Sequence, residues 1–331
     1  MTSSNRTRGA REEDLHAVVR LFKDVWGGGL DESSLRSRFR HRYVENPNGN
    51  GWNALLVSPG QQGLSGMAGM LDIELAHAGR CLPASFCVDL AVDRAHRGRG
   101  IARLLQRRRN ARGRLVLVTN INRPGQAVAE STGARKVVDC PVLRRWVRPS
   151  DLAGRGRSAP GETREAPETP DARFDTLWDR ARQSYPSIAK RDRSTLHWRY
   201  SSHPSRRFRF HVFAADDPSE IQGYVVTTLQ PWVAGLQRAV IVDLLFSPFD
   251  AGQVVDCMRV VQSRMARARA ICTDVMASSP DLDRVMRNIG FVDKSRSTSL
   301  FVHPSEITEE HPLIWQPASW YLTYGDSDFF L

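Results

Sequence analysis

The chain has 331 residues, of which 41% are hydrophobic and 25% are charged. That length suits about two domains of ordinary size, and the composition excludes a disordered, collagen-like or disulfide-scaffold protein. No apolar stretch is long enough for a membrane helix, the N-terminus lacks the apolar core of a signal peptide, and the five cysteines show no CxxC spacing. We therefore expect a reduced cytoplasmic protein with no metal site.

The net charge of +11 is concentrated in the first half of the chain. Residues 1–152 contain 25 basic and 14 acidic residues, whereas the remaining residues are balanced. Such asymmetry favours a polyanionic partner at the first half, either a phosphate-rich cofactor or a nucleic acid.

Apolar residues at helical spacing, such as Leu15, Val18, Val19 and Phe22, open the first half. The elements predicted there, in chain order, are helices over 12–25 and 31–43, strands over 53–57, 66–75 and 85–92, a helix over 98–112, a strand over 114–120, a helix over 124–132 and a strand over 134–147.

Residues 154–172 are rich in Gly, Pro, Glu and Arg without large apolar side chains, and they predict a linker. The second half then repeats the order of the first, with strands over 208–214, 224–229 and 240–246, a helix over 251–267, a strand over 271–277, a helix over 280–288 and a strand over 291–302.

Short motifs also recur between the halves. Arg42-Tyr43 matches Arg199-Tyr200, and Val88-Asp89-Leu90 matches Val242-Asp243-Leu244 at nearly the same separation. The sequence therefore predicts a duplicated α/β chain. We expect domains over 1–153 and 173–331, each with a mixed central sheet flanked by helices.

The strongest local motif joins the strand over 85–92 to the helix that follows. Gly98, Gly100 and Ala102 are small enough for backbone N–H groups to approach a ligand, and the positive end of the helix points to the same place. The charges of Arg97, Arg99 and Arg103 add to this cradle, which is typical of a pyrophosphate site. It matches neither the P-loop nor the dinucleotide fingerprint.

Residues 97–102 fit the Q/R-x-x-G-x-G/A motif of the GNAT superfamily of acyl-CoA-dependent N-acetyltransferases, and the chain resembles tandem GNAT proteins. The resemblance implies an opening between two central strands, with pantetheine along the first strand and pyrophosphate on the cradle. The acyl-CoA-binding residues that it implies are Leu90, Ala91, Val92, Arg97, Gly98, Arg99, Gly100, Ile101, Ala102, Arg103 and Asn122.

The second half departs from this pattern. Ala251, Val254 and Asp256 stand where the first half has Arg97, Gly100 and Ala102. A β-branched side chain and a carboxylate both oppose a bound phosphate. We therefore expect one acyl-CoA site per chain, with the second half structural or forming one wall of the acceptor site.

Acyl transfer to an amine needs a general base, and the resemblance places it near the strand over 85–92. Asp89 is the first candidate, Glu74 the second and Asp72 the third. Because Asp243 matches Asp89 in the half without a cradle, a structural role for Asp89 has nearly equal weight.

The general acid stays open. Many members of the family use a Tyr four residues before the Gly of the later motif, a position that Ala129 holds here. Either another group, such as Cys140, Tyr43 or a water molecule, protonates the thiolate, or no acid is required.

The aromatic-rich segment over 315–328 has two interpretations. Its rings and acids suit a pocket for a cationic or sugar-like acceptor, but such a terminus more often docks onto a core.

The resulting prediction is an N-acyltransferase that moves an acyl group, acetyl first, from acyl-CoA to a primary amine of a small molecule, amino sugar or biosynthetic intermediate. An aminoacyl-tRNA or carrier-protein donor is an alternative on the same fold. A nucleic-acid-binding protein is an alternative of another class, resting on basic residues that no stacking-aromatic or helix-turn-helix pattern accompanies. They are Arg103, Arg107, Arg108, Arg109, Arg112 and Arg114. We expect no membrane partner and a monomer with an internal pseudo-dimer.

Overall fold

The computed structural model describes residues 7–27, 29, 31–60, 63–119, 121–153, 169–214, 217 and 219–327, so most of the predicted linker lies outside it. The helices are α1 (Leu15–Trp26), α2 (Glu32–Tyr43), α3 (Ile101–Asn110), α4 (Arg123–Ser131), α5 (Pro149–Ala153), α6 (Ala172–Ser184), α7 (Arg193–Leu196), α8 (Ala251–Arg267), α9 (Pro280–Asn288) and α10 (Glu306–Glu310). The strands are β1 (Arg8–Gly9), β2 (Leu55–Gly60), β3 (Gly63–His77), β4 (Arg80–Val92), β5 (Leu115–Val118), β6 (Arg135–Trp146), β7 (Ser187–Ala189), β8 (Arg209–Ala214), β9 (Ile221–Pro231), β10 (Gln237–Phe246), β11 (Ala270–Met276), β12 (Val292–Val302) and β13 (Trp320–Tyr321).

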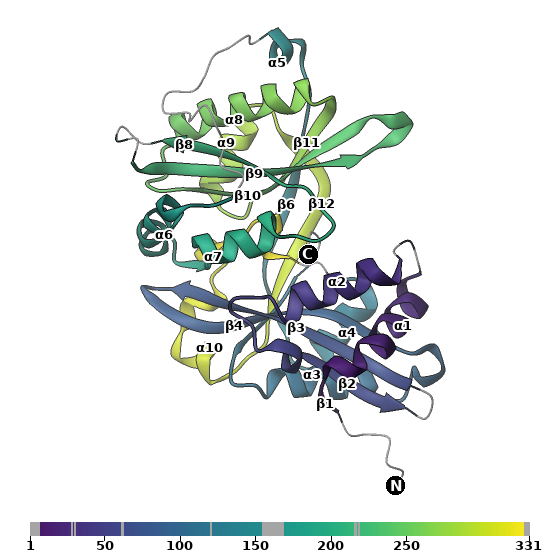
Figure 1. The fold of residues 1–331 in the computed structure, drawn as a ribbon. Helices are drawn as coiled ribbons and strands as arrows, with labels where there is room; N and C mark the ends of the chain where they lie inside the picture. The colour runs from purple at the N-terminus through teal and green to yellow at the C-terminus, as the bar shows by residue number, and fades with distance from the viewer. Residues whose placement is uncertain are drawn as a thin grey trace.

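These strands form one sheet that runs through both halves (Figure 1). Its main order is β1-β2-β3-β4-β5-β12-β6-β11-β10-β9-β8, while the short β7 and β13 pair beside β3. From the outer edges inward, the antiparallel strands β1 to β4 in the first half and β8 to β10 in the second each lead to one parallel pair. These pairs are β4 with β5 and β10 with β11. The mixed sheet flanked by helices is confirmed, and its order repeats around the central pair β12 and β6.

The halves exchange their last strands. β12, from the second half, lies between β5 and β6, whereas β6, from the first half, lies between β12 and β11. The sequence predicted a sheet in each half and did not predict this exchange. Each of the two segments is predicted from its sequence as the last strand of its own half. Only the tertiary structure shows which half each strand completes.

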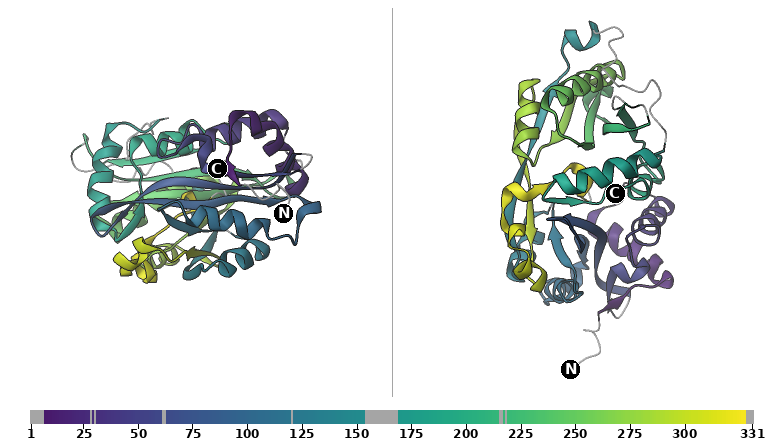
Figure 2. Two further views of the ribbon diagram at one scale, coloured as in Figure 1. Left: turned by 90° about the horizontal axis from the view of Figure 1, so that it is seen from below. Right: turned by 90° about the vertical axis from the view of Figure 1, so that its left-hand side faces the viewer.

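The helices cover both faces of the sheet. Over the first half, α1 and α2 lie on one face and α3 and α4 on the other, as the purple and blue helices of Figure 2 show. The core of the first half also includes Leu300 and Val302 of the exchanged strand β12, together with Trp320 of β13. Among the described helices, none has the length and apolar character needed to span a bilayer.

Local chemistry explains the element ends around the site. Asn122 caps α4 by accepting a hydrogen bond from the Gly125 N–H at 2.9 Å, and Pro124 stands in the first turn, where its missing N–H costs nothing. α3 begins directly after Gly100, whose φ of +77° turns the chain out of the extended strand.

Candidate active site

A cavity of about 980 Å³ lies where β4 and β5 separate. The two strands pair in parallel only from Ala84 to Phe86 on β4, so the edge of β4 beyond Phe86 has no partner on that side. The ends of both strands line the cavity together with the starts of α3 and α4. This arrangement is the opening between central strands that the GNAT resemblance implies.

Two glycines shape one end of the cavity. Gly98 and Gly100 have φ values of +75° and +77°, and the space beside each Cα is free of other atoms within 4 Å. This left-handed backbone favours glycine, and the free space lets a ligand approach the backbone closely. The N-terminus of α3 lies at the same place, so its N–H groups and dipole suit an anion such as pyrophosphate.

The structure brings nearly all of the predicted acyl-CoA-binding residues to this cavity. Those that line it are Leu90, Ala91, Val92, Arg97, Gly98, Gly100, Ile101, Ala102, Arg103 and Asn122. Arg99 does not line it and lies exposed on the surface. Asp89 also lines the cavity, whereas Glu74 does not.

Asp89 stands in a bulge of β4, with a φ of +50°. Its carboxylate accepts hydrogen bonds from Arg42 Nη1 at 2.5 Å and Tyr43 Oη at 2.6 Å. Burial raises the pKa of Asp89, but the charges of Arg42 and Arg38 and the bond from Tyr43 outweigh burial and hold that pKa below its usual value. The side chain is therefore an ionised, tightly held carboxylate at the wall of the cavity.

The second half builds the same kind of cluster around Asp243. Tyr200 Oη donates to its carboxylate at 3.1 Å, as Tyr43 does to Asp89, and Arg191 Nε supplies the positive charge at 3.1 Å. The matched motifs of the two halves thus form matched buried clusters. This similarity supports a structural contribution of Asp89, because Asp243 does not line the described cavity.

The other two carboxylate candidates lie away from the cavity. Glu74 is half-exposed on β3, where its carboxylate is 3.7 Å from Lys190 Nζ. Asp72 is buried and accepts a hydrogen bond from Ser85 Oγ at 2.6 Å. β3 carries both side chains past the region where β4 and β5 separate, which the order of residues alone does not reveal.

The structure also bears on the candidates for the general acid. Ala129 lines the cavity at the position where the family's Tyr stands, and it offers no proton. Tyr43 is buried against Asp89, and burial raises its pKa well above the usual value. Cys140 lines a separate, very small space, and burial raises the pKa of its thiol to about 12.

Several lining residues escaped the sequence prediction. Val25 and Trp26, at the end of α1, form part of the wall, and the glycine run that follows Trp26 is the signal that marked this end. Gln106, Arg109 and Thr119 also line the cavity. Their positions depend on which faces of α3 and β5 turn inward, and polar side chains on an inward face break the usual pattern of apolar burial.

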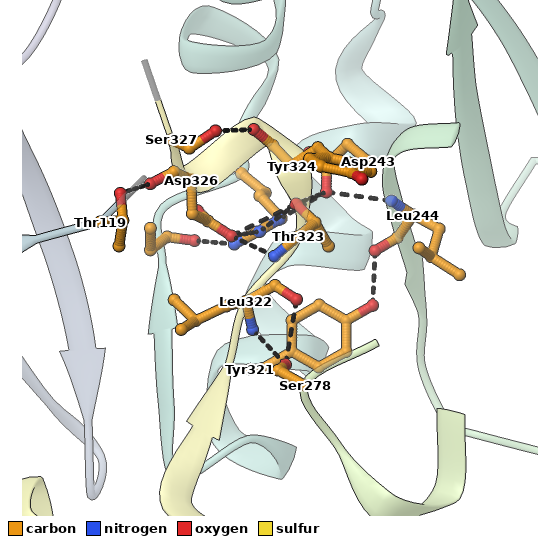
Figure 3. Close-up of polar contacts among 12 residues, drawn as sticks. Thr119, Asp243, Leu244, Ser278, Tyr321, Leu322, Thr323, Tyr324, Asp326 and Ser327 are labelled. Atoms are coloured by element: carbon orange, nitrogen blue, oxygen red, sulfur yellow. Dashed lines mark hydrogen bonds and ion pairs between the residues drawn. The ribbon is translucent and has the colours of Figure 1, made fainter. Parts of the chain in front are cut away.

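In the second half, residues 320–327 lie against the ends of β10 and β11, at the place that corresponds to the cavity (Figure 3). Tyr321 Oη donates to the Leu244 carbonyl at 2.6 Å, Thr323 Oγ1 donates to Asp243 at 3.0 Å, and the Leu322 N–H donates to Ser278 Oγ at 2.6 Å. Trp320 and Tyr321 are buried. The aromatic segment therefore docks onto the core, although Asp328 lies outside the described residues.

The same segment reaches the first half. Thr119 Oγ1, in the wall of the cavity, donates to the Asp326 carbonyl at 3.4 Å, and the Asp326 carboxylate pairs with Arg191 at 2.5 Å. Residues 320–327 thus connect the filled space of the second half with the open cavity of the first.

The basic residues that favoured nucleic acid do not form one surface. Arg107 and Arg108 are exposed, but Arg109 is buried. Arg112 donates to the Asn53 carbonyl at 2.6 Å and Arg114 to the Ala84 carbonyl at 3.3 Å. Side chains that cap backbone carbonyls offer a reduced positive surface to a phosphate backbone.

Comparison with known proteins agrees with this geometry. Residues 6–112 match the model of an acetyltransferase (GNAT) domain, which includes the cradle and β4. Residues 6–112 are therefore a GNAT acetyltransferase domain. No curated protein sequence matches the chain.

Solved structures extend the likeness of the fold to both halves of the chain. A GCN5-related N-acetyltransferase from Anabaena variabilis is 12% identical, with a TM-score of 0.66 over 90% of this chain and 72% of that one. A second from Kribbella flavida is 16% identical, with a TM-score of 0.61 over 90% and 70%. N-myristoyltransferase of Saccharomyces cerevisiae with bound myristoyl-CoA is 12% identical, with a TM-score of 0.61 over 92% and 83%.

The GNAT domain indicates that this protein is a transferase. The residues of the cavity fit acyl-CoA, because the cradle has free backbone positions for phosphates and β4 has an open edge for an extended arm. In the described residues, no cluster of His, Cys, Asp or Glu is arranged to hold a metal ion.

Proposed function

We propose that the protein is an N-acyltransferase that binds one acyl-CoA in the cavity of the first half and transfers the acyl group to a small primary amine. The observation that carries the proposal is the coincidence of the left-handed glycine cradle, the α3 N-terminus and the unpaired edge of β4 in one cavity. The cradle leaves room for the phosphates of acyl-CoA, and the positive end of the α3 dipole favours their negative charge. The unpaired edge of β4 can hydrogen-bond with the amides of the pantetheine arm.

In this reaction the acceptor nitrogen attacks the thioester carbonyl, the C–S bond breaks, and the amine proton leaves as the thiolate gains one. The open edge of β4 from Leu90 to Val92 orients the donor, and its N–H groups polarise the carbonyl. Asp89 holds the bulge of β4 in place through Arg42 and Tyr43. Its lowered pKa makes it a weak base, so we assign it a positioning role rather than proton removal.

The second half is proposed to support the first without binding acyl-CoA. Val254 and Asp256, which the sequence aligns with the cradle, lie inside α8 and not in the turn before it. At the start of α8, Asp250 stands where Gly100 precedes α3, and its carboxylate opposes a bound phosphate. Residues 320–327 occupy the space that the donor takes in the first half. The exchange of β6 and β12 supports a monomer whose halves form an internal pseudo-dimer. An amino sugar or a biosynthetic amine remains the acceptor class that we propose.

Titration calorimetry of acetyl-CoA into the full chain tests this proposal. We expect one site per chain, and Gly100→Val should weaken binding by at least about tenfold, because its side chain strains a left-handed position and fills the cradle. Gly113→Val is the matched control. Gly113 has a φ of +66° and equally free space, lies after the other end of α3 and does not line the cavity.

Binding that survives Gly100→Val, or that Gly113→Val weakens equally, would contradict the cradle. An intact protein that binds no acetyl-CoA would remove it as the donor and favour an aminoacyl-tRNA or carrier-bound acyl group. Two sites per chain would show that the second half binds acyl-CoA too.

A further inference from the structure

One charged side chain in the cavity has no role in the proposed reaction. Arg109 lies on the inner face of α3, is only 1% exposed and lines the wall beside Val88. Its neighbours in sequence, Arg107 and Arg108, are exposed to solvent. Burying a guanidinium costs several kcal/mol unless an opposite charge or a full set of hydrogen bonds compensates it, so Arg109 calls for a partner.

The protein supplies Arg109 with some hydrogen-bond acceptors but with no opposite charge in an ion pair. Arg109 Nη2 donates to the Val88 carbonyl, Nη1 donates to Gln106 Oε1 at 3.1 Å, and Nε has no acceptor. No carboxylate in the described part of the chain forms an ion pair with it. His303, which contacts Gln106, adds no negative charge. Burial and the charge of Arg109 lower the pKa of His303 to about 4, so it is neutral at pH 7.

The second half shows that the fold does not require this charge. Leu105, Gln106 and Arg109 of α3 have the same burial and spacing as Val261, Gln262 and Met265 of α8. Met265 packs in the apolar core of its half. At this matched position, α3 carries Arg109 and borders the cavity, whereas α8 carries Met265 and borders the apolar core.

The position on β4 that Arg109 contacts, Val88, indicates which part of an acyl donor would lie beside Arg109. The cradle lies beyond Val92, and the open edge that suits pantetheine runs back from Val92 to Leu90. Val88 lies two residues further in the same direction, a step of about 6–7 Å in a strand. An acyl group that continues from Leu90 toward Val88 therefore ends beside Arg109.

We propose that the acyl donor is a dicarboxylic acyl-CoA of the succinyl type, whose free carboxylate pairs with Arg109. Two methylenes between thioester and carboxylate suit the step from Leu90 to Val88. The carboxylate accepts from guanidinium N–H groups that the protein leaves unpaired, and it neutralises the buried charge. The inference rests on the proposed function. In the transfer, the acceptor nitrogen forms the amide bond at the thioester carbon, the sulfur leaves with the bonding pair and takes up a proton, and the distal carboxylate remains free in the product.

Titration calorimetry with succinyl-CoA and butyryl-CoA tests the assignment, because these donors have the same length and differ in carboxylate against methyl. We expect the protein to bind succinyl-CoA more tightly by roughly 10- to 100-fold, the range for hydrogen bonds to a charged group. Arg109→Met, which installs the residue of the second half, should abolish or reverse this preference. Arg108→Met, the exposed neighbour, should leave it unchanged.

A merely structural Arg109, holding only the Val88 carbonyl, predicts a different result: Arg109→Met would weaken both donors by the same factor. That outcome, or an intact protein that does not prefer succinyl-CoA, would overturn the proposal. If Arg109→Met does not fold, Arg109→Lys serves in its place, because it keeps the charge and should retain part of the preference for succinyl-CoA. The preference of the intact protein for succinyl-CoA over butyryl-CoA tests the proposal without any variant. Free CoA is the reference. Binding of CoA without a preference leaves the proposed function standing, whereas no binding of CoA removes both.

Discussion

At the scale of the residue, the two buried clusters around Asp89 and Asp243 carry most of the information. Both aspartates accept a hydrogen bond from a tyrosine that lies two strands before the strand of the aspartate, but the rest of each cluster differs. Asp89 depends on Arg42 and Tyr43, whereas Asp243 also accepts from Thr323 and from Tyr224, the latter at 3.3 Å. A charge with fewer partners depends more strongly on each one.

This difference predicts unequal effects of one mutation made in both halves. Tyr43→Phe should lower the free energy of unfolding by roughly 1.5–3 kcal/mol, as expected for a lost hydrogen bond to a carboxylate. Tyr200→Phe should cost less, because Asp243 keeps four other partners and loses a longer bond. Urea unfolding of both variants measures the difference. Equal losses, or a larger loss for Tyr200→Phe, would show that the two clusters do not differ as their contacts indicate.

At the scale of the element, the segment over 320–327 decides the difference between the halves. It is held by hydrogen bonds to the ends of both β10 and β11, and the rings of Trp320 and Tyr321 are buried. The space that opens between β4 and β5 is therefore packed between β10 and β11. A donor cannot enter there without displacing buried contacts of the chain itself.

Tyr321→Phe tests the hold of this segment. The Leu244 carbonyl would lose its donor inside the core, which should cost about 1–3 kcal/mol in the free energy of unfolding while acyl-CoA binding stays at one per chain. Tyr185→Phe is the matched control. Its hydroxyl donates to the Phe246 carbonyl from a half-buried position, where water can replace it. Thermal unfolding and calorimetry give both readouts, and a larger loss for Tyr185→Phe would contradict this account.

At the scale of the whole molecule, the strand exchange joins the halves more firmly than a shared surface would. β12 completes the sheet beside β5 and β6 completes it beside β11, so separating the halves breaks backbone ladders on both sides. The core of the first half also contains side chains of the second. Neither half retains a complete sheet on its own.

Cleavage between the halves tests this dependence. With a specific protease site inserted within residues 154–168, the cut chain should elute as one species in gel filtration and keep its acetyl-CoA site. A fragment over 169–331 made alone should not fold, because it lacks β6. Two folded fragments that separate after cleavage would show that each half completes its own sheet.

The sequence alone was enough to predict the local elements and the cradle. Helical and strand spacing, Asn122 before Pro124, and the small residues of 98–102 act over a few residues, and the structure has α3, α4 and β4 where these patterns predicted them. The acyl-CoA-binding residues that we predicted between Leu90 and Arg103 line one cavity, apart from Arg99, because they lie close together in the sequence and a correct strand–turn–helix brings them together.

Only the tertiary structure decided the features that depend on contacts between distant segments. Glu74 lies outside the cavity because of the register of β3, Arg109 lies inside because of the face that α3 turns to β4, and the last strands change places because either half can hydrogen-bond with them. Backbone hydrogen bonds do not distinguish one strand of suitable length from another. The partner of β6 and the filling of the second half by residues 320–327 are therefore set by how the whole chain packs.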